Sequence, residues 1–573
     1  MARRLATLNL PAPVVATTEE VVAADLRLRE HLAVLAAGFV VYLALVLYFW
    51  RVSVFAPDAV SRTASAFFVL FSRDPHLGAI GFVWNPLPAF IQLPVVFVFH
   101  YLGIDVILAG GVVTALLGAG TLVFMNWLLF QSGIGRIRYA LVALYGLNPM
   151  IALYSANGMS EALFIFLLVL IVCGFIRWGN TGTLTGFLGL TAASVLVVQT
   201  RYEALAFVAA VTFCLVPVLY PLAKYLGIDV LSRRIEAYLI TYLGSVSYSF
   251  GLWIYFNWTI MGDPLHFLHS NYGNLAQTAV LFGSDAAAPL RGAAGSIVGA
   301  TVYGLWHLGA LYPIFFAVLL AGLVVVARRR QIMLFCVLLM AVSVPAFEIL
   351  MLYRASSFGW LRFFMYGIPF TILLLAELHR SAPDWFDKRR SSTVWSAIIA
   401  LMLLSNVASW LAMNTPQVGR EEWLALRKVS EPSFSPGGDW LEEHRAIANA
   451  IEELPPKRLV LLPTYLGYAI PLVAPDPTRY IVTSDREFDQ VLAAPAPTAS
   501  YIMVPQPEGN GKSDPVNQKY STLWERGTPW TEFVRDFRTV DVHWRLYKVL
   551  RNPDDPVQPV EPTAGASGDA ARR

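Results

Sequence analysis

The stretch HLAVLAAGFVVYLALVLYFW, residues 31–50, decides the fold class of this chain, and it contains no charged side chain between Leu32 and Trp50. The hydrocarbon core of a bilayer is about 30 Å thick, and a helix needs about 20 apolar residues to cross it. The stretch therefore predicts a transmembrane helix. It is too long for the apolar part of a cleavable signal peptide, and the polar residues before it do not match one. We expect residues 1–31 to form a cytoplasmic tail.

Similar apolar runs follow along much of the chain. Of the 573 residues, 56% are hydrophobic and 14% are charged, whereas soluble domains are about 25% charged. The runs predict a polytopic α-helical membrane domain over residues 32–413 with about 11 spans. They begin near residues 32, 105, 139, 159, 183, 202, 237, 305, 331, 363 and 393.

Basic loops predict the orientation, because loops rich in Lys and Arg stay in the cytoplasm. All the basic loops can lie in the cytoplasm only if residues 86–101 do not cross the membrane. This stretch contains three prolines, so we expect it to form a helix that lies in the membrane interface. Residues 52–104 then form a large extracytoplasmic loop with surface helices at 58–71 and 86–101. Eleven spans place the C-terminal region outside. The basic positions are Arg136, Arg138, Arg177, Lys224, Arg233, Arg234, Arg328–Arg330, Arg380 and 388–390.

The C-terminal region is expected to be a small extracytoplasmic α/β domain over residues 414–551. Short β-branched and aromatic runs between turn residues are typical of strands. The expected strands are 458–463, 479–483, 500–504 and 540–549, with a helix near 487–492. Residues 552–573 are expected to be a disordered tail.

Composition excludes several other classes. The net charge of +3 and the lack of a basic, aromatic-interleaved stretch give no indication of nucleic acid binding. Cys173, Cys214 and Cys336 lie inside apolar runs, so neither a disulfide framework nor a Cys-rich metal site is expected. Asp263, His266 and His269 form no recognisable metal motif. We predict no cofactor and no metal ligands, and leave a divalent metal open.

Acidic side chains are scarce in the membrane domain, where each one is costly unless it is paired or hydrated. Several are expected at or near the outer face: Asp58, Asp74, Glu161, Glu203, Asp263, Asp285 and Glu348. The same face is expected to carry Arg62, Arg73, Arg201, Arg291, Arg354 and Arg362. A carboxylate can act as a general base, and arginine suits phosphate recognition. Together they match transfer of a sugar from a polyprenyl phosphate.

The order of short motifs resembles the GT-C superfamily of membrane glycosyltransferases, in the group related to protein mannosyltransferases and lipid A aminoarabinose transferases. The resemblance covers roughly residues 30–413. The resembling segments are 56–59 (APDA), 85–88 (NPLP), 155–161 (SANGMSE), 200–204 (TRYEA), 262–265 (GDPL) and 361–363 (LRF).

The resemblance implies an inverting hexosyl- or pentosyltransferase of the cell envelope, with a polyprenyl-phosphate sugar as donor and a lipid, glycan or protein as acceptor. It implies that Asp58 lies at the acceptor as the catalytic base, or positions that base. We expect the substrate-binding residues to be Asp74, Asn85, Glu161, Arg201, Glu203, Arg354 and Arg362. An excess of arginine over lysine points to a bacterial cytoplasmic membrane.

Two positions depart from the family pattern. Ala59 follows Asp58 where many relatives have a second acid, and Asn85 replaces the usual His or Lys. Structural roles are also open: Asp58 suits a helix N-cap, Asp74 before Pro75 suits a turn, and Arg201 with Glu203 suits mutual neutralisation. Two other functions compete, namely a lipid or solute transporter or flippase and a non-catalytic scaffold. Transporters often show inverted repeats and midplane polar groups, and neither is evident here.

Overall fold

The chain folds into two compact units in the computed structural model, which describes residues 18–220, 228–270, 272–387, 391–431, 434, 439–539 and 542–555. The helical unit comprises Met1–Ala66 and Ile80–Phe434, and the C-terminal unit comprises Phe67–Ala79 and Ser435–Arg573. Helix α2 (Pro57–Phe71) therefore begins in one unit and ends in the other.

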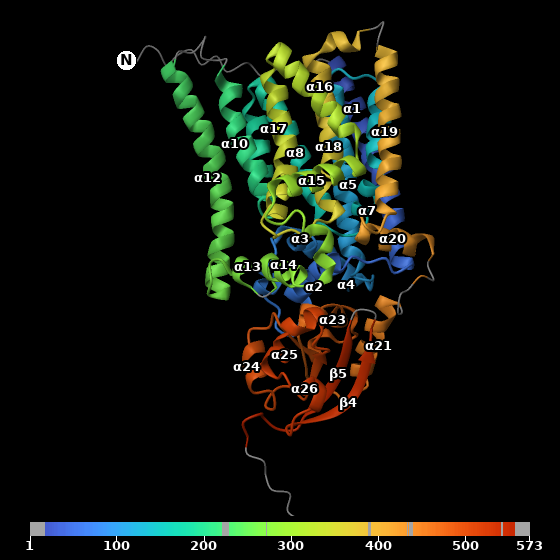
Figure 1. Cartoon of the computed structure of the whole chain (residues 1–573), viewed down its shortest axis with the longest axis vertical. Coiled ribbons are helices and arrows are strands. Elements are labelled where there is room, and N and C mark those ends of the chain that lie inside the picture. Colours follow the sequence, from blue (N-terminus) through green and yellow to red (C-terminus); the bar gives the residue numbers. More distant parts are fainter. Residues whose placement is uncertain are drawn as a thin grey trace, which may run out of the picture. The chain divides into compact units, whose positions relative to one another are not determined.

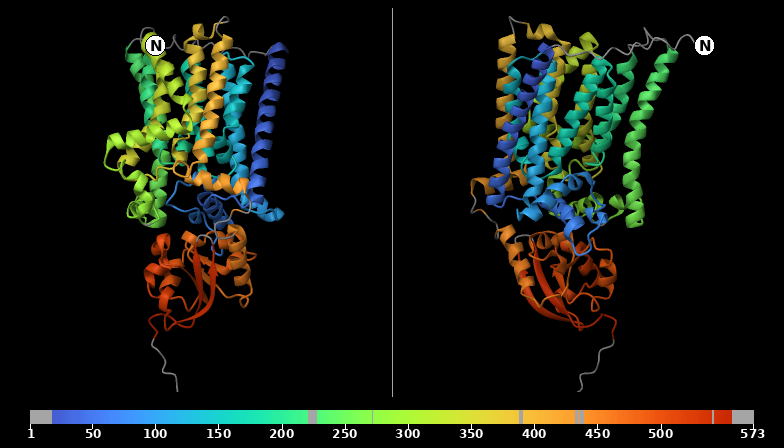
Figure 2. Two further views of the ribbon diagram at one scale, coloured as in Figure 1. Left: turned by 45° about the vertical axis from the view of Figure 1, so that its right-hand side comes forward. Right: turned by 180° about the vertical axis from the view of Figure 1, so that it is seen from behind.

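Long helices run side by side in the helical unit (Figures 1 and 2). They are α1 (Thr18–Arg51), α5 (Leu108–Gln131), α8 (Ser160–Thr181), α12 (Ile228–Met261), α17 (Ile332–Tyr353), α18 (Gly367–Ser381) and α19 (Ser391–Met413). Shorter helices lie between them: α6 (Ile137–Gly146), α7 (Pro149–Tyr154), α9 (Leu184–Val197), α10 (Ala204–Leu219), α15 (Ile297–Leu311) and α16 (Ile314–Arg329).

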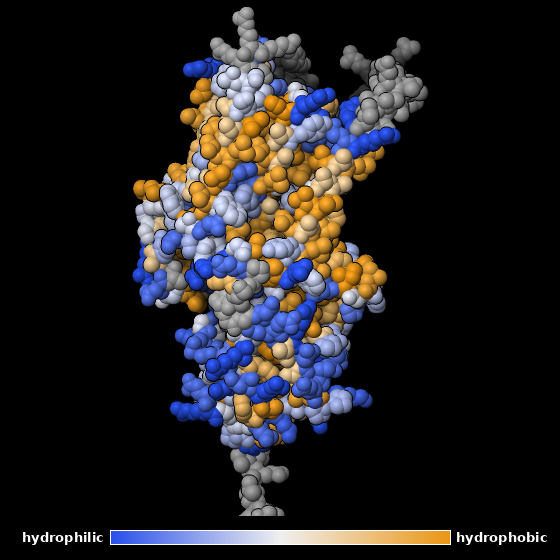
Figure 3. Space-filling model, turned by 90° about the vertical axis from the view of Figure 1, so that its right-hand side faces the viewer, coloured by the Kyte–Doolittle hydropathy of each residue, from blue (hydrophilic) through white to orange (hydrophobic). Residues whose placement is uncertain are grey.

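Six described helices are long and apolar enough to cross a membrane. Their burial differs widely, since 94% of the apolar window in Leu361–Ser381 is buried but only 28% of that in Ser392–Met413. Figure 3 shows hydrophobic residues gathered over the bundle, whereas the surface of the C-terminal unit is mostly hydrophilic. An apolar surface of this extent is stable against lipid and not against water. The chain is a multi-pass membrane protein.

The predicted count of 11 spans is not confirmed by the described helices. A bent pair, α15 and α16, raises the number of candidate spans from six to seven if it is counted as one. The two helices meet at 108°. The bend lies at Tyr312 and Pro313, between the two helices. Tyr312 is not helical, because proline disfavours the helical conformation in the residue before it, and Pro313 itself has no N–H to continue the hydrogen bonds of α15. The expected spans near 139, 183 and 202 correspond to helices shorter than 18 residues.

The expected surface helices of the first loop are present. The helix predicted at 58–71 is α2, and that predicted at 86–101 is split into α3 (Leu87–Phe90) and α4 (Leu93–Leu102). Each of the two pieces has a proline in its first turn, where the missing N–H is tolerated. Helices α3, α13 (His266–His269), α14 (Asn274–Phe282) and α20 (Arg420–Ser430) gather at one end of the bundle (Figures 1 and 2).

The C-terminal unit contains a mixed five-stranded sheet of order β2-β1-β3-β5-β4. The strands β1 (Val460–Leu462), β2 (Tyr480–Val482) and β3 (Tyr501–Pro505) are parallel, while β5 (His543–Val549) is antiparallel to β3 and to β4 (Thr531–Arg538). Its helices are α21 (Trp440–Glu452), α22 (Thr464–Gly467), α23 (Ala469–Val473), α24 (Phe488–Ala493), α25 (Pro515–Lys519) and α26 (Leu523–Arg526).

Four strands and α24 lie where the sequence predicts them. Strand β4 was missed because it is largely exposed and charged, so the apolar alternation of a half-buried strand is absent. Residues 540–541 of the last expected strand and the expected tail beyond Asp555 fall outside the described residues. The cytoplasmic and extracytoplasmic assignments of the tail, the loops and the C-terminal domain remain predictions.

Candidate functional site

A cavity of about 710 Å³ lies within the helical unit, within the usual range for small-molecule sites. Its wall combines charged groups with aromatic and apolar ones. The charged and amide groups are Asp58, Arg62, Asn85, Arg201, Glu203, Asn274, Gln277, Glu348, Arg354 and Arg362. The aromatic groups are Trp84, Tyr202, Phe250, Phe267, Phe347, Phe358, Trp360 and Phe363.

Arg362 is the centre of the charged side of this cavity. Its guanidinium donates to Asp58 Oδ2 at 3.1 Å and to Glu421 Oε2 at 2.5 Å, and its Nε lies 3.4 Å from Glu161 Oε1. These carboxylates come from α2, α8 and α20, so one buried cation joins three distant segments. The Trp360 ring lies against the same guanidinium, 4.0 Å from centroid to Cζ, where a cation–π contact adds stability.

Arg201 forms a second cationic centre beside the first. Its Nη1 donates to Glu161 Oε1 at 2.7 Å, and its Nη2 donates to Glu203 Oε1 at 2.6 Å. Glu161 is fully buried, with 0% of its side chain exposed, and it is shared between Arg201 and Arg362. A buried carboxylate is stable only with such partners. Arg201 and Glu203 therefore do form the ion pair that the sequence analysis left open, and Glu161 is a second partner of the same arginine.

Two further arginines of the cavity form no ion pair within the described part of the chain. Arg62 lies four residues after Asp58 on the same face of α2, and its Nη1 is buried without a hydrogen-bond partner among the described groups. Arg354, at the end of α17, is exposed to the cavity. Unpaired guanidiniums next to aromatic walls form a site suited to an anion with an apolar or sugar portion.

Asp58 is the accessible carboxylate of the Arg362 cluster. It lies in the first turn of α2, and 52% of its side chain is exposed, against 35% for Glu421 and 0% for Glu161. A base must reach the proton it removes, so Asp58 is the carboxylate best placed for that role.

The remaining predicted residues occupy different places. Asn85 lines the cavity, but its amide donates to Val198 O at 2.8 Å and so ties the first loop to the segment before α10. Asp74 does not line this cavity. It lies in the C-terminal unit and is paired with Arg486, which gives its carboxylate a partner other than substrate.

Two contributors, Glu421 and Glu422, escaped the sequence analysis, and a third, Glu348, was expected at the outer face but not among the substrate-binding residues. Glu421 and Glu422 follow the last span, where acids were assigned to a soluble domain, yet α20 belongs to the helical unit. Glu422 accepts from the Tyr154 hydroxyl at 2.7 Å and is buried. The third, Glu348, accepts a hydrogen bond from Ser357. The signal for α20 was its amphipathic pattern directly after a span.

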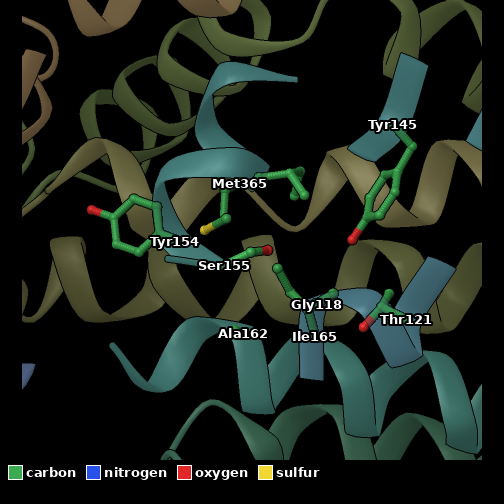
Figure 4. A pocket seen from close by; sticks show the side chains of 9 residues that line it. Gly118, Thr121, Tyr145, Tyr154, Ser155, Ala162, Ile165 and Met365 are labelled. Atoms are coloured by element: carbon green, nitrogen blue, oxygen red, sulfur yellow. The ribbon is translucent and has the colours of Figure 1, made fainter. Parts of the chain in front are cut away.

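A second, much smaller cavity of about 10 Å³ lies between α5, α7 and α8 (Figure 4). It is lined by Tyr145, Ser155 and Met365, among others. A volume near that of one water probe holds one water at most. Close packing at Gly118, where a Cβ would lie 2.6 Å from Ser155 Oγ, keeps it small. No substrate fits here.

Within the described ranges, no group of three or more His, Cys, Asp or Glu side chains is placed to hold a metal ion.

Comparison with known proteins finds similarity in backbone structure and none in sequence. No protein-family model matches the chain, and no curated protein matches its sequence significantly. ArnT from Cupriavidus metallidurans, in a crystal structure bound to undecaprenyl phosphate, is 13% identical with a TM-score of 0.48, covering 89% of this chain and 97% of that chain. An oligosaccharyltransferase from Archaeoglobus fulgidus in the apo form is 12% identical with a TM-score of 0.44, covering 82% and 69%. Likenesses at this level do not establish function.

Proposed function

We propose that the chain is an integral membrane glycosyltransferase that moves a sugar from a polyprenyl-phosphate donor to an acceptor hydroxyl at the extracytoplasmic face. The observation that carries the proposal is a cavity with two arginines, Arg62 and Arg354, that form no ion pair among the described residues, two paired arginines, Arg201 and Arg362, and the accessible carboxylate of Asp58. The motif order that resembles the GT-C superfamily agrees with it.

The phosphate of the donor is assigned to the arginines. A phosphate near lipid is poorly solvated, and guanidiniums provide charge-assisted hydrogen bonds to it. Arg62 and Arg354 form no ion pair within the described ranges and can bind it directly, while Arg362 can exchange a carboxylate for a phosphate oxygen. Aromatic side chains such as Trp360 and Phe363 supply flat apolar faces for the sugar and the first isoprene units.

The reaction is a single displacement with inversion. The acceptor oxygen attacks the anomeric carbon, and the bond from that carbon to the phosphate oxygen breaks with its electron pair leaving on the phosphate. Asp58 takes the acceptor proton. Phosphate binding draws Arg362 away from Asp58 and leaves the carboxylate oxygen free to accept the proton of the acceptor hydroxyl. Glu161 keeps Arg201 and Arg362 in position.

A transporter is supported less well. Transporters place their polar groups near the midplane on broken helices, whereas the charged cluster here is built by α2, α20 and the first turn of α8, at an end of the bundle (Figures 1 and 2). A scaffold without activity would not require an accessible carboxylate beside unpaired arginines.

Direct assay tests the proposal. Purified chain in nanodiscs is incubated with radiolabelled undecaprenyl-phosphate hexoses and pentoses plus an envelope extract as acceptor. The expected result is transfer of label with release of undecaprenyl phosphate, and loss of both in Asp58→Asn. Mass spectrometry of envelope glycans from a deletion strain identifies the missing product. Movement of intact lipid-linked sugar across vesicles without bond cleavage would instead show a flippase.

A further inference from the structure

Glu348 lies in the wall of the large cavity, and the proposed reaction gives it no role. It is the only charged residue of the span Ile332–Tyr353, and it is 4% exposed. Among the described residues it has no ion-pair partner, whereas Glu161, which is also buried, lies between two guanidiniums. An ionisable side chain within a membrane span is costly and usually marks a substrate or ion pathway. Glu348 is therefore a candidate for ligand binding.

The loop that follows α17 holds Glu348 in one orientation. The Ser357 hydroxyl donates to Glu348 Oε1, and the Gly359 backbone N–H donates to Ser357 Oγ at 2.9 Å. The Tyr303 hydroxyl of α15 donates in turn to Gly359 O at 3.0 Å. Because this chain of hydrogen bonds is already formed without a ligand, a ligand that binds the carboxyl loses less entropy in ordering it.

Three side-chain oxygens at this end of the cavity are left to accept hydrogen bonds. No described group donates to Glu348 Oε2. Two amides of α14 line the same cavity, and Asn274 Nδ2 donates to Ser356 O at 2.7 Å while Gln277 Nε2 donates to Tyr272 O at 2.8 Å. A backbone carbonyl only accepts, so these contacts identify the amide nitrogens and leave the two amide oxygens for a ligand.

Aromatic rings border these acceptors. The rings of Phe358 and Trp360 line the cavity and are stacked on each other, with centroids 4.4 Å apart and planes at 13°. Acceptor oxygens beside flat apolar faces suit a sugar, whose hydroxyls donate and whose C–H groups pack against rings. Arg354 lies in the same wall and disfavours a cationic substituent on that sugar.

The same end of the cavity is close to the groups assigned to the donor phosphate. Arg354 precedes Ser356 by two residues in the loop after α17. Arg201 and Glu203 lie near enough to Glu348 to interact with it electrostatically. In the donor the sugar is bonded directly to the phosphate, so a group that contacts hydroxyls next to these arginines contacts the sugar of the donor.

We propose that Glu348, with the amide oxygens of Asn274 and Gln277, binds hydroxyls of the transferred sugar and selects a neutral sugar over an amino sugar. Glu348 is a specificity-determining residue and takes no part in bond cleavage. The inference rests on the proposed function for the identity of the donor. Binding of a lipid-linked sugar is nevertheless measurable without transfer.

Binding is measured by titration of the full-length protein in nanodiscs. The variants are Glu348→Met, which removes the carboxyl, and Glu348→Gln, which keeps its shape. The matched control is Glu377→Gln, since Glu377 is also buried and accepts from a serine hydroxyl, that of Ser381 at 3.5 Å, but does not line the cavity. The ligands are undecaprenyl phosphate, its neutral hexose and pentose conjugates, and amino-sugar conjugates. Thermal unfolding checks that each variant is folded.

Wild type should bind one neutral conjugate about tenfold or more tightly than bare undecaprenyl phosphate, and more tightly than the amino-sugar conjugates. Glu348→Met should remove most of this preference and Glu348→Gln part of it, with binding of bare undecaprenyl phosphate unchanged. The unfolding temperature of Glu348→Met should not fall, because a carboxyl within a span is costly. Glu377→Gln should keep the wild-type preference.

Deoxy analogues of the preferred conjugate identify the hydroxyl that Glu348 binds. Removal of that hydroxyl should weaken binding to wild type by about tenfold and leave binding to Glu348→Met unchanged, because the two changes remove the same contact. Removal of a hydroxyl that Glu348 does not contact should weaken both proteins equally. Equal effects of every deoxy position in the two proteins would overturn the inference.

Three other results would also overturn it. These are an unchanged sugar preference in both Glu348 variants, an equal loss of binding for bare undecaprenyl phosphate, and tighter binding of an amino-sugar conjugate by wild type. If wild type transfers sugar but its preference does not depend on Glu348, the inference fails and the proposed function stands. If the preference depends on Glu348 but no sugar is transferred, the proposed function fails and the sugar-binding role of Glu348 stands.

Discussion

Glu161 and Arg362 illustrate how charges are kept inside this bundle. Glu161 has no exposed side-chain surface and lies between two guanidiniums, whereas Arg362 lies among three carboxylates. A buried charge that loses its partner costs several kcal/mol, so these groups are mutually dependent. Substitutions at the buried members of the cluster, Glu161 and Arg362, test folding as well as chemistry, whereas those at the exposed Asp58 and Arg354 test mainly chemistry.

Replacement of Asp58 by Asn separates a catalytic role from a structural one. The structure places Asp58 within the first turn of α2 and not at the N-cap. Asn retains the size and an oxygen for Arg362, but it is not a base. We expect turnover to fall by about 10²–10⁴-fold, with unfolding unchanged. Initial rates with a radiolabelled donor and thermal unfolding of the same preparation measure the two effects. Normal turnover in this variant would leave Asp58 only a structural role as a partner of Arg362.

Alanine variants of Arg354 and Arg362 can be compared to test binding of the donor phosphate. Arg354→Ala removes a guanidinium without an ion pair in the described chain, so we expect about tenfold weaker binding of undecaprenyl phosphate at unchanged stability. Arg362→Ala should weaken binding and also destabilise the protein by about 2 kcal/mol or more, because Glu161 loses a partner. Titration with undecaprenyl phosphate and thermal unfolding check both. Equal stability loss in the two variants would contradict this distinction.

At the scale of elements, α20 is the segment whose role was least expected. It follows the last span and brings two carboxylates to the helical unit, one to Arg362 and one to Tyr154. This amphipathic helix thereby supplies a negative charge that helps to neutralise Arg362. The sequence analysis assigned the same region to a different domain. In the proposed reaction, Glu421 competes with a bound phosphate for Arg362.

Glu421→Gln should strengthen phosphate binding. The amide keeps the shape but no longer neutralises Arg362, so undecaprenyl phosphate should bind about three- to tenfold more tightly. The adjacent Glu422→Gln is the control, because Glu422 contacts Tyr154 and not Arg362. Fluorescence or calorimetric titration in nanodiscs distinguishes them. Weaker binding in Glu421→Gln would show that Glu421 orients Arg362 toward the phosphate and does not compete with it.

The cap of α25 provides a pH-dependent element. Asp514 accepts from Val516 N–H at 2.9 Å, and burial raises the pKa of its carboxyl to about 7. A group whose folded pKa exceeds its unfolded value binds more protons when folded, so its contribution to stability is lost as pH rises from about 4 to about 7.

Asp514→Asn should flatten that dependence and keep the cap. Urea unfolding of the C-terminal unit, followed by hydrogen exchange at 501–505, is compared at pH 5 and pH 8 in both proteins. We expect wild type to lose about 1–3 kcal/mol more than the variant over this interval. An identical pH dependence would mean that Asp514 does not titrate in the folded protein.

At the scale of the whole molecule, the orientation in the membrane remains the main prediction. Basic loops place Arg328 in the cytoplasm and the C-terminal domain outside. Single cysteines at Arg328 and Lys512 test it, and the native Cys173, Cys214 and Cys336 are buried and should react slowly. In intact cells an impermeant thiol reagent should label Lys512→Cys only. Labelling of Arg328→Cys alone would place the candidate site on the cytoplasmic side.

The membrane class, the helices of the first loop and most strands of the C-terminal unit followed from sequence alone. These features depend on local hydrophobicity and on short-range turn chemistry, which a chain carries residue by residue. The scarcity of acids in apolar segments also identified Asp58, Glu161 and Glu203 as candidates, because an intramembrane charge is costly wherever it lies.

Only the tertiary structure decided which charges meet. Asp58 and Arg362 are 304 positions apart, Tyr154 and Glu422 are 268 apart, and Asp74 finds its partner 412 positions away. Ion pairs and hydrogen bonds act over a few ångströms and depend on packing. Composition and periodicity contain no such distances, so the sequence did not show that Asp74 pairs with Arg486, and Glu421 was overlooked.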